Sequence, residues 1–243
     1  MATASDYPEG VSIPHVIWQC FLMTAVFYLW SSPVIQPVKI MVVLFHEMSH
    51  GLMALVTGGK VLTIMITADE GGSCETEGGA AALIVSAGYL GSMFFGGLLL
   101  YLSRFRGCVP VVYTFLTLTV VSAIFTVLHD PYSRTFATGL AAAFIFLGLL
   151  APTILGALFL RVLGTVSCLY SIFDIYWDVL ATRPGRNAPE NDAIAFSSLT
   201  GVDSQLVGGL WLVISIIYFV VIVKIILRQG SPPVAVPGKV ATA

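Results

Sequence analysis

Long segments without a charged side chain make up most of this chain and constrain its fold more than any other feature. Of its 243 residues, 57% are hydrophobic and 10% are charged, whereas soluble domains carry about 25% charged residues. So few charges cannot cover a water-exposed surface, and 11 Lys and Arg against 13 Asp and Glu form no basic patch for a nucleic acid. The composition therefore indicates a multi-pass integral membrane protein whose surroundings are the lipid bilayer, and we expect it in an endomembrane.

The uncharged segments have the length of membrane-spanning helices. A helix needs about 20 mostly apolar residues to cross the hydrocarbon core, where irregular backbone cannot face lipid. We predict an all-α polytopic membrane protein with about six to seven transmembrane helices in a single domain over residues 15–228. Residues 1–14 are predicted to be a short N-terminal tail, and residues 229–243 a disordered C-terminal tail. The predicted crossings are 15–30, 38–57, 80–102, 110–128, two within 136–180 that part near Pro152, and 206–227.

The segment between the second and third crossings is not helical. Residues 60–79 begin with a run rich in β-branched side chains and continue with acidic residues and two Gly-Gly pairs. Two short runs around Gly71-Gly72 predict a small β-hairpin at the membrane edge. The alternative interpretation is an ordinary acidic loop.

The third crossing has a face of small residues. Gly88, Ser92 and Gly96 recur every four residues, as do Ala87 and Gly91. Small side chains let two helices approach closely in lipid. We expect this face to pack against neighbouring helices, including the second crossing.

The second crossing contains three ionisable residues within five positions: His46, Glu47 and His50. Ionisable groups inside a spanning helix are costly and indicate function by default. The two histidines are one turn apart, so both imidazoles project from the same face and can share a tetrahedral zinc ion. Glu47 lies beside His46, where it can act as the general base of a His-Glu-x-x-His zinc peptidase. The alternative is that all three residues only hydrogen-bond to neighbouring helices.

A catalytic zinc ion also needs a third protein ligand and an open position for water. The sixth crossing carries a polar stripe that includes Asp174 and Asp178. At 1.5 Å per residue, Asp174 lies at a depth similar to that of the two histidines. We predict Asp174 as the third ligand, with Asp178 as the first alternate and Asp130 or His129 as less favoured ones. The alternative role of Asp174 is a buried carboxylate that pairs with Arg161 or with Tyr and Ser hydroxyls.

Taken in order, these motifs resemble the site-2 protease-like intramembrane zinc metallopeptidases, and within them the B-like branch of the M50 peptidase family. The resemblance covers roughly residues 38–220. It implies that His46 and His50 are zinc ligands, that Glu47 is the base, and that an aspartate from a later helix is the third ligand. In site-2 proteases that aspartate is followed by glycine, whereas Asp174 is followed by isoleucine. The matching segments are 45–51, 57–59 with the hairpin, 78–79, 87–92, 171–178, 191–196 and Trp211.

The residues and the resemblance together predict a zinc metalloendopeptidase that hydrolyses a peptide bond in or beside a transmembrane segment of a client membrane protein. A substrate helix must unwind first, and we expect the hairpin to hold it as an added edge strand near Val61, Thr63 and Met65. One alternative is a catalytically inactive zinc-binding scaffold or chaperone for client helices. A metal transporter is less favoured, because it would need charges along a whole pathway or paired broken helices.

Overall fold

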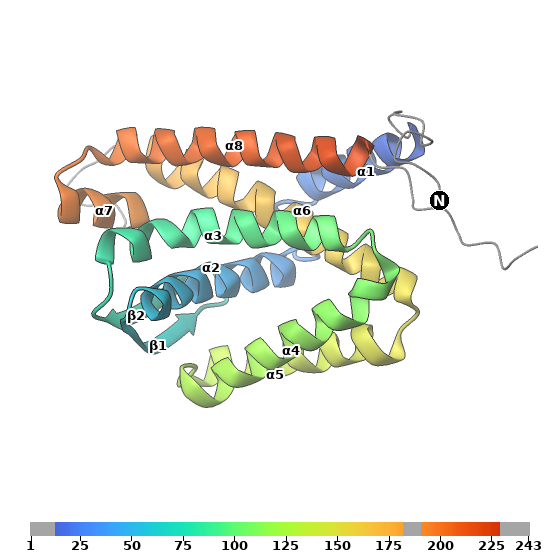
Figure 1. Ribbon diagram of the computed structural model, residues 1–243, viewed down its shortest axis with the longest axis horizontal. Helices are drawn as coiled ribbons and strands as arrows, with labels where there is room; N and C mark the ends of the chain where they lie inside the picture. The colour runs from blue at the N-terminus through green and yellow to red at the C-terminus, as the bar shows by residue number, and fades with distance from the viewer. Residues whose placement is uncertain (1–12, 182–190, 229–243) are drawn as a thin grey trace, which may run out of the picture.

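The chain folds into a helical bundle with one small β-hairpin (Figure 1). The computed structural model describes residues 13–181 and 191–228. The predicted C-terminal tail lies outside these ranges, as does nearly all of the predicted N-terminal tail. In chain order the described elements are α1 (Ile13–Tyr28), α2 (Gln36–Val56), β1 (Lys60–Ile66), β2 (Gly72–Glu77), α3 (Ala81–Leu102), the 3-10 turn η1 (Arg106–Cys108), α4 (Val109–Thr126), α5 (Pro131–Ile145) with its π-helical continuation η2 (Phe146–Leu150), α6 (Thr153–Asp174) with its π-helical continuation η3 (Ile175–Ala181), α7 (Asp192–Thr200) and α8 (Ser204–Arg228).

Six helices in the described residues are long and apolar enough to cross a membrane, which confirms the prediction of a polytopic all-α membrane protein. The first predicted crossing corresponds to α1, whose 16 residues span about 24 Å and fall short of a core about 30 Å thick. Helix α7 was not predicted, because its nine residues are too few to cross. The six candidate spans are Gln36–Val56, Ala81–Leu102, Arg106–Thr126, Pro131–Leu150, Thr153–Ala181 and Ser204–Leu227.

Helix α3 lies at the centre of the bundle, where it packs against α2, α6, α7 and α8 (Figure 1). Its small residues allow the close approach that the sequence predicts. A Cβ atom at Gly91 would lie 2.6 Å from the Ser49 Cβ on α2, and one at Gly96 would lie 2.7 Å from the Ser167 Cβ on α6. On the α6 side, a Cβ atom at Gly164 would lie 2.5 Å from the carbonyl oxygen of Gly96. The packing role of this face is therefore confirmed.

The predicted hairpin is present as the antiparallel pair of β1 and β2. The outer edge of β1 is occupied by the connection between α4 and α5 and by the first turn of α5. The Ile64 N–H donates to the carbonyl of Val127 at 2.9 Å, and the Ile66 N–H donates to the Ser133 hydroxyl at 2.9 Å. In the described residues β2 pairs with β1 alone, so β2 is the strand whose outer edge is open.

Polar contacts fix the tip of the hairpin to the start of α2. The ammonium group of Lys39 forms a 2.5 Å ion pair with the Glu70 carboxylate, and Lys39 also lies 5.4 Å above the Trp30 ring. The Gln36 amide donates to the carbonyl of Ala68 at 2.9 Å. These contacts hold the hairpin along α2, the helix that carries the two histidines.

The contact between α3 and α6 generates a stability prediction. We expect Gly164→Ala to destabilise the protein by about 1–3 kcal/mol, because the new methyl group would meet the backbone of α3 and not a movable side chain. Gly139→Ala is the matched control, because a Cβ atom there meets nothing within 4 Å. Thermal unfolding in detergent should show a lower Tm for Gly164→Ala only. Equal Tm values for the two variants would contradict this packing.

Candidate metal centre

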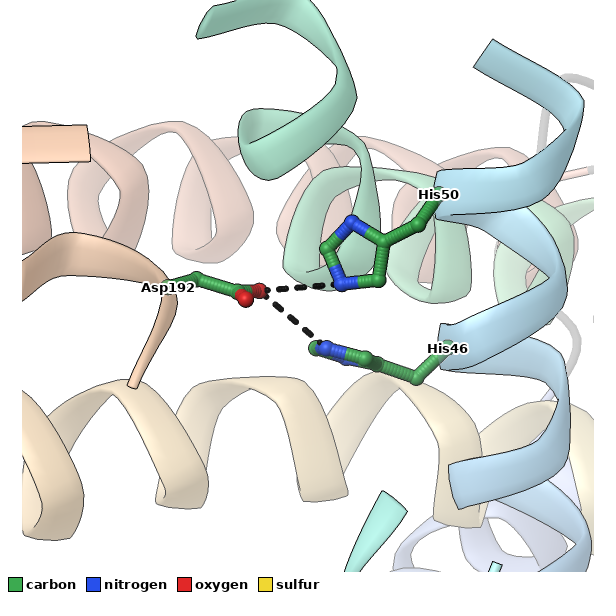
Figure 2. A group of neighbouring side chains, drawn as sticks. All are labelled: His46, His50 and Asp192. Carbon is green, nitrogen blue, oxygen red and sulfur yellow. Dashed lines mark ion pairs between the residues drawn. The ribbon is translucent and has the colours of Figure 1, made fainter. Parts of the chain in front are cut away.

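The two histidines project side by side from α2 (Figure 2). Helix α2 has a proline, Pro37, in its first turn, and Gly58, with φ +84, follows its C-cap residue Thr57. The helix between them is long enough to contain the whole His-Glu-x-x-His motif. The imidazole centroids of His46 and His50 are 4.8 Å apart. Both Nε2 atoms therefore face the same space, as their four-residue spacing predicts.

The third member of the group is Asp192, the first residue of α7. Asn191 caps this helix, because its side chain accepts a hydrogen bond from the Ile194 N–H at 3.0 Å. The cap directs Asp192 towards α2, where its Oδ2 lies 3.1 Å from the His46 Nε2 and 3.4 Å from the His50 Nε2 (Figure 2). Three side chains from two distant segments thus converge on one point.

The spacing of these atoms fits a tetrahedral metal ion. Two ligand atoms at about 2.0–2.1 Å from zinc, separated by the tetrahedral angle, are about 3.4 Å apart. The two distances from Asp192 match this value, and all three ligand atoms lie within 4.8 Å of one another. The Asp192 Oδ2 is also buried without a hydrogen-bond donor in the described residues. Two imidazoles and a carboxylate are a common zinc ligand set, so the residues present suit this ion.

The surroundings of His50 orient its ring. Its Nδ1 lies 2.6 Å from the carbonyl oxygen of Ile84 on α3. When Nδ1–H donates to this oxygen, Nε2 carries the lone pair, which is the arrangement that a metal-binding histidine requires. The backbone of α3 also closes one side of the site, because a Cβ atom at Gly88 would lie 2.4 Å from both Nε2 atoms.

The candidate base Glu47 is buried, with 6% of its surface exposed. It lies against β2, because a Cβ atom at Gly72 would be 2.4 Å from the Glu47 Oε1. Glycine at position 72 therefore leaves room for the carboxylate between α2 and the hairpin. This contact places the hairpin directly at the candidate centre.

The electrostatics of the group favour an ionised Asp192. Burial alone would raise the pKa of the Asp192 carboxyl group, but the two adjacent histidines, His46 and His50, outweigh burial and hold this pKa well below its usual value. At neutral pH the side chain is therefore a carboxylate, the form that binds a metal ion.

Two of the aspartates predicted from the sequence, Asp174 and Asp130, are not part of the group that the structure brings together. Asp174 is the last residue of α6, a helix that packs mainly on α3. Asp130 caps α5, where its Oδ1 accepts a hydrogen bond from the Ser133 N–H at 2.9 Å, and His129 also lies outside the group. The side chain of Asp178 lies outside the described residues. The structure therefore groups Asp192, and not Asp174, with the two histidines.

The prediction assumed that the third ligand comes from a spanning helix at the depth of the histidines. The carboxylate that lies beside the histidines in the structure comes instead from the short helix α7, between the last two candidate spans. One signal was available in the sequence: an Asn-Asp pair ahead of an apolar run is typical of a helix start with an acidic first turn.

A comparison with protein-family models supports the resemblance noted in the sequence. The model of the Peptidase M50B-like family matches residues 19–222, a segment that runs from α1 to α8 and contains the whole candidate centre. No curated protein and no solved structure gives a match. Because the matched segment is well over half of the chain, this protein belongs to the Peptidase M50B-like family.

Proposed function

We propose that this protein is a zinc-dependent endopeptidase that cleaves a client membrane protein in or beside a transmembrane segment. The convergence of the His46 Nε2, the His50 Nε2 and the Asp192 Oδ2 is the observation that carries the proposal. Membership of a membrane metallopeptidase family supports the same reaction class. The chemistry that zinc supplies when it is bound is polarisation of the scissile carbonyl and activation of a water molecule near neutral pH.

Glu47 has the role of general base. It follows His46 directly in the sequence, and its carboxylate is buried against Gly72 at the same side of α2 as the hairpin. In this role it accepts a proton from the attacking water and delivers it to the leaving amine. A second acidic group is not required, because one carboxylate can carry out both transfers in turn.

The depth of the centre favours a substrate within the membrane. His46 lies ten residues after Gln36, the first residue of α2, which corresponds to roughly 15 Å of helix rise and half of a core about 30 Å thick. A peptide bond that reaches this depth belongs to a membrane-embedded segment or to its immediate flank.

The open edge of β2 is the proposed place for the unwound substrate. Ile64 and Ile66 direct their N–H groups away from β2, so their partners Cys74 and Gly72 direct their own backbone groups to the outer edge of β2. A strand added at this edge would run past Gly72 and hence past Glu47. This replaces the prediction of binding at Val61, Thr63 and Met65, because β1 already has neighbours on both edges.

The ligand set can be tested by metal content. We expect Asp192→Ala to lower zinc affinity by more than about 100-fold, because a direct ligand is removed. Loss of a residue that only hydrogen-bonds to a ligand typically lowers the affinity by about 10–100-fold. Asp174→Ala is the control and should bind zinc as the wild-type protein does. Purified protein dialysed against a zinc-buffered chelator and measured by elemental mass spectrometry gives both affinities. Zinc loss in Asp174→Ala together with full retention in Asp192→Ala would show that the ligand assignment is wrong.

The role of Glu47 can be tested by separating binding from cleavage. Glu47→Gln should retain zinc, because Glu47 is not among the three converging ligands, while cleavage of a co-reconstituted client should fall by about 10²–10⁴-fold. Unchanged cleavage would exclude Glu47 as the base. The wild-type protein could instead bind zinc and the client as tightly as Glu47→Gln does and still cleave no client. That result would replace the peptidase proposal with the scaffold alternative.

A further inference from the structure

Helix α7, which carries Asp192, is joined to α8 by a short connection and lies beside the first turns of that helix (Figure 1). Gly201 ends α7 in the left-handed conformation, with φ +75. The Asp203 carboxylate then caps α8 by accepting hydrogen bonds from the Gln205 and Leu206 N–H groups at 3.0 and 3.1 Å. The two helices therefore form a tight hairpin, and the position of Asp192 depends on how α7 packs against α8.

An aromatic contact joins these two helices one turn away from the candidate ligand. Phe196 follows Asp192 by four residues, so both side chains project from the same face of α7. The centroid of the Phe196 ring lies 5.7 Å from that of the Trp211 ring on α8, at an interplanar angle of 81°. Aromatic pairs prefer this edge-to-face arrangement. Ala193, next to Asp192, is completely buried in the same apolar cluster, so the side of α7 that carries the candidate ligand also packs against the bundle.

The aromatic contacts continue from α8 to the histidine that faces Asp192. The Trp211 ring lies 5.9 Å from the Tyr89 ring on α3, and the Tyr89 ring lies 4.9 Å from the His46 imidazole on α2. Trp211 and Tyr89 are both buried. Four rings from four helices thus connect Phe196 to His46. The 3.1 Å contact of the His46 Nε2 with the Asp192 Oδ2, together with the helical turn from Asp192 to Phe196, closes the series into a ring of contacts.

We propose that Phe196 and Trp211 are positioning residues that fix the separation between His46 and Asp192 before a metal ion binds. The inference rests on the proposed zinc centre. The spacing of His46 and His50 is set by one turn of α2, whereas the position of Asp192 depends on contacts between helices. A ligand that is already in place loses less conformational entropy when the ion binds. Residues that orient a ligand without touching the metal ion typically account for about 10–100-fold in affinity.

The zinc affinity of the full-length protein in detergent, measured with a zinc-buffered chelator, tests this role. We expect Phe196→Ala to lower the affinity by about 10–100-fold, because α7 loses a contact that holds Asp192 in place. Phe196 is only partly buried, so this variant should still fold. Trp211→Ala should have the same effect, and Trp211→Phe, which keeps a ring beside Phe196, should restore most of the affinity.

The matched control is Phe136→Ala. Phe136 is partly buried, as Phe196 is, and its ring stacks on the Tyr132 ring of the same helix, α5, with centroids 6.4 Å apart. The variant therefore removes a comparable side chain from a helix that carries no candidate ligand. Its zinc affinity should equal that of the wild-type protein, and a loss as large as that of Phe196→Ala would overturn the inference.

A double-mutant cycle separates positioning from general destabilisation. In the Asp192→Ala background α7 has no ligand to position, so adding Phe196→Ala should lower the zinc affinity no further. A loss by the same factor in both backgrounds would overturn the inference. Wild-type affinity in Phe196→Ala and Trp211→Ala, together with a loss in Asp192→Ala, would also overturn it and leave the proposed peptidase intact. Absence of zinc binding by the wild-type protein would instead refute the proposed zinc centre, and this inference with it.

Discussion

The close approach of α3 to α2 and α6 is the contact on which the rest of the structure depends. Gly88 places the α3 backbone against the two imidazoles, Gly91 admits Ser49, and Gly96 admits Ser167. Because lipid gives helices no hydrophobic reason to associate, such small-residue packing and a few hydrogen bonds must hold the bundle together. The same contact positions the carbonyl of Ile84, which orients His50, so packing and the geometry of the candidate centre are set by one interface.

The ionisable groups of α2 can be buried at a low free-energy cost only because groups from other segments lie beside them. With neutral imidazoles at His46 and His50, which metal binding requires, and ionised carboxylates at Glu47 and Asp192, the buried group would carry two negative charges. A divalent cation would leave that group neutral overall, which removes much of the cost of burying unpaired charge. The hairpin and α7 reach this group from outside the spanning helices, and the Lys39–Glu70 ion pair fixes the hairpin in turn.

The sequence predicted the features that have a local signature. Apolar segment length identified the spanning helices, glycine spacing identified the packing face of α3, and the spacing of His46 and His50 placed both rings on one side of α2. Asp192 was missed because its proximity to the histidines arises from the fold: nothing in its local sequence encodes a contact 142 residues away from His50. The occupied edge of β1 was missed for the same reason, since Val127 and Ser133 come from the end of α4 and the start of α5, far along the chain. The periodicity of apolar residues in the sequence indicates which face of a helix or strand is apolar. The partners of buried polar groups depend instead on how the helices and strands pack together.

If His46, His50 and Asp192 hold a zinc ion, X-ray absorption at the zinc edge of the purified protein will identify their ligand atoms. We expect nitrogen and oxygen ligands at about 2.0–2.2 Å, with the scattering pattern of two imidazole rings and no sulfur. A sulfur shell at about 2.3 Å would contradict this ligand set, because Cys74, which packs against Gly51 of α2, would then be the source of a ligand in place of Asp192.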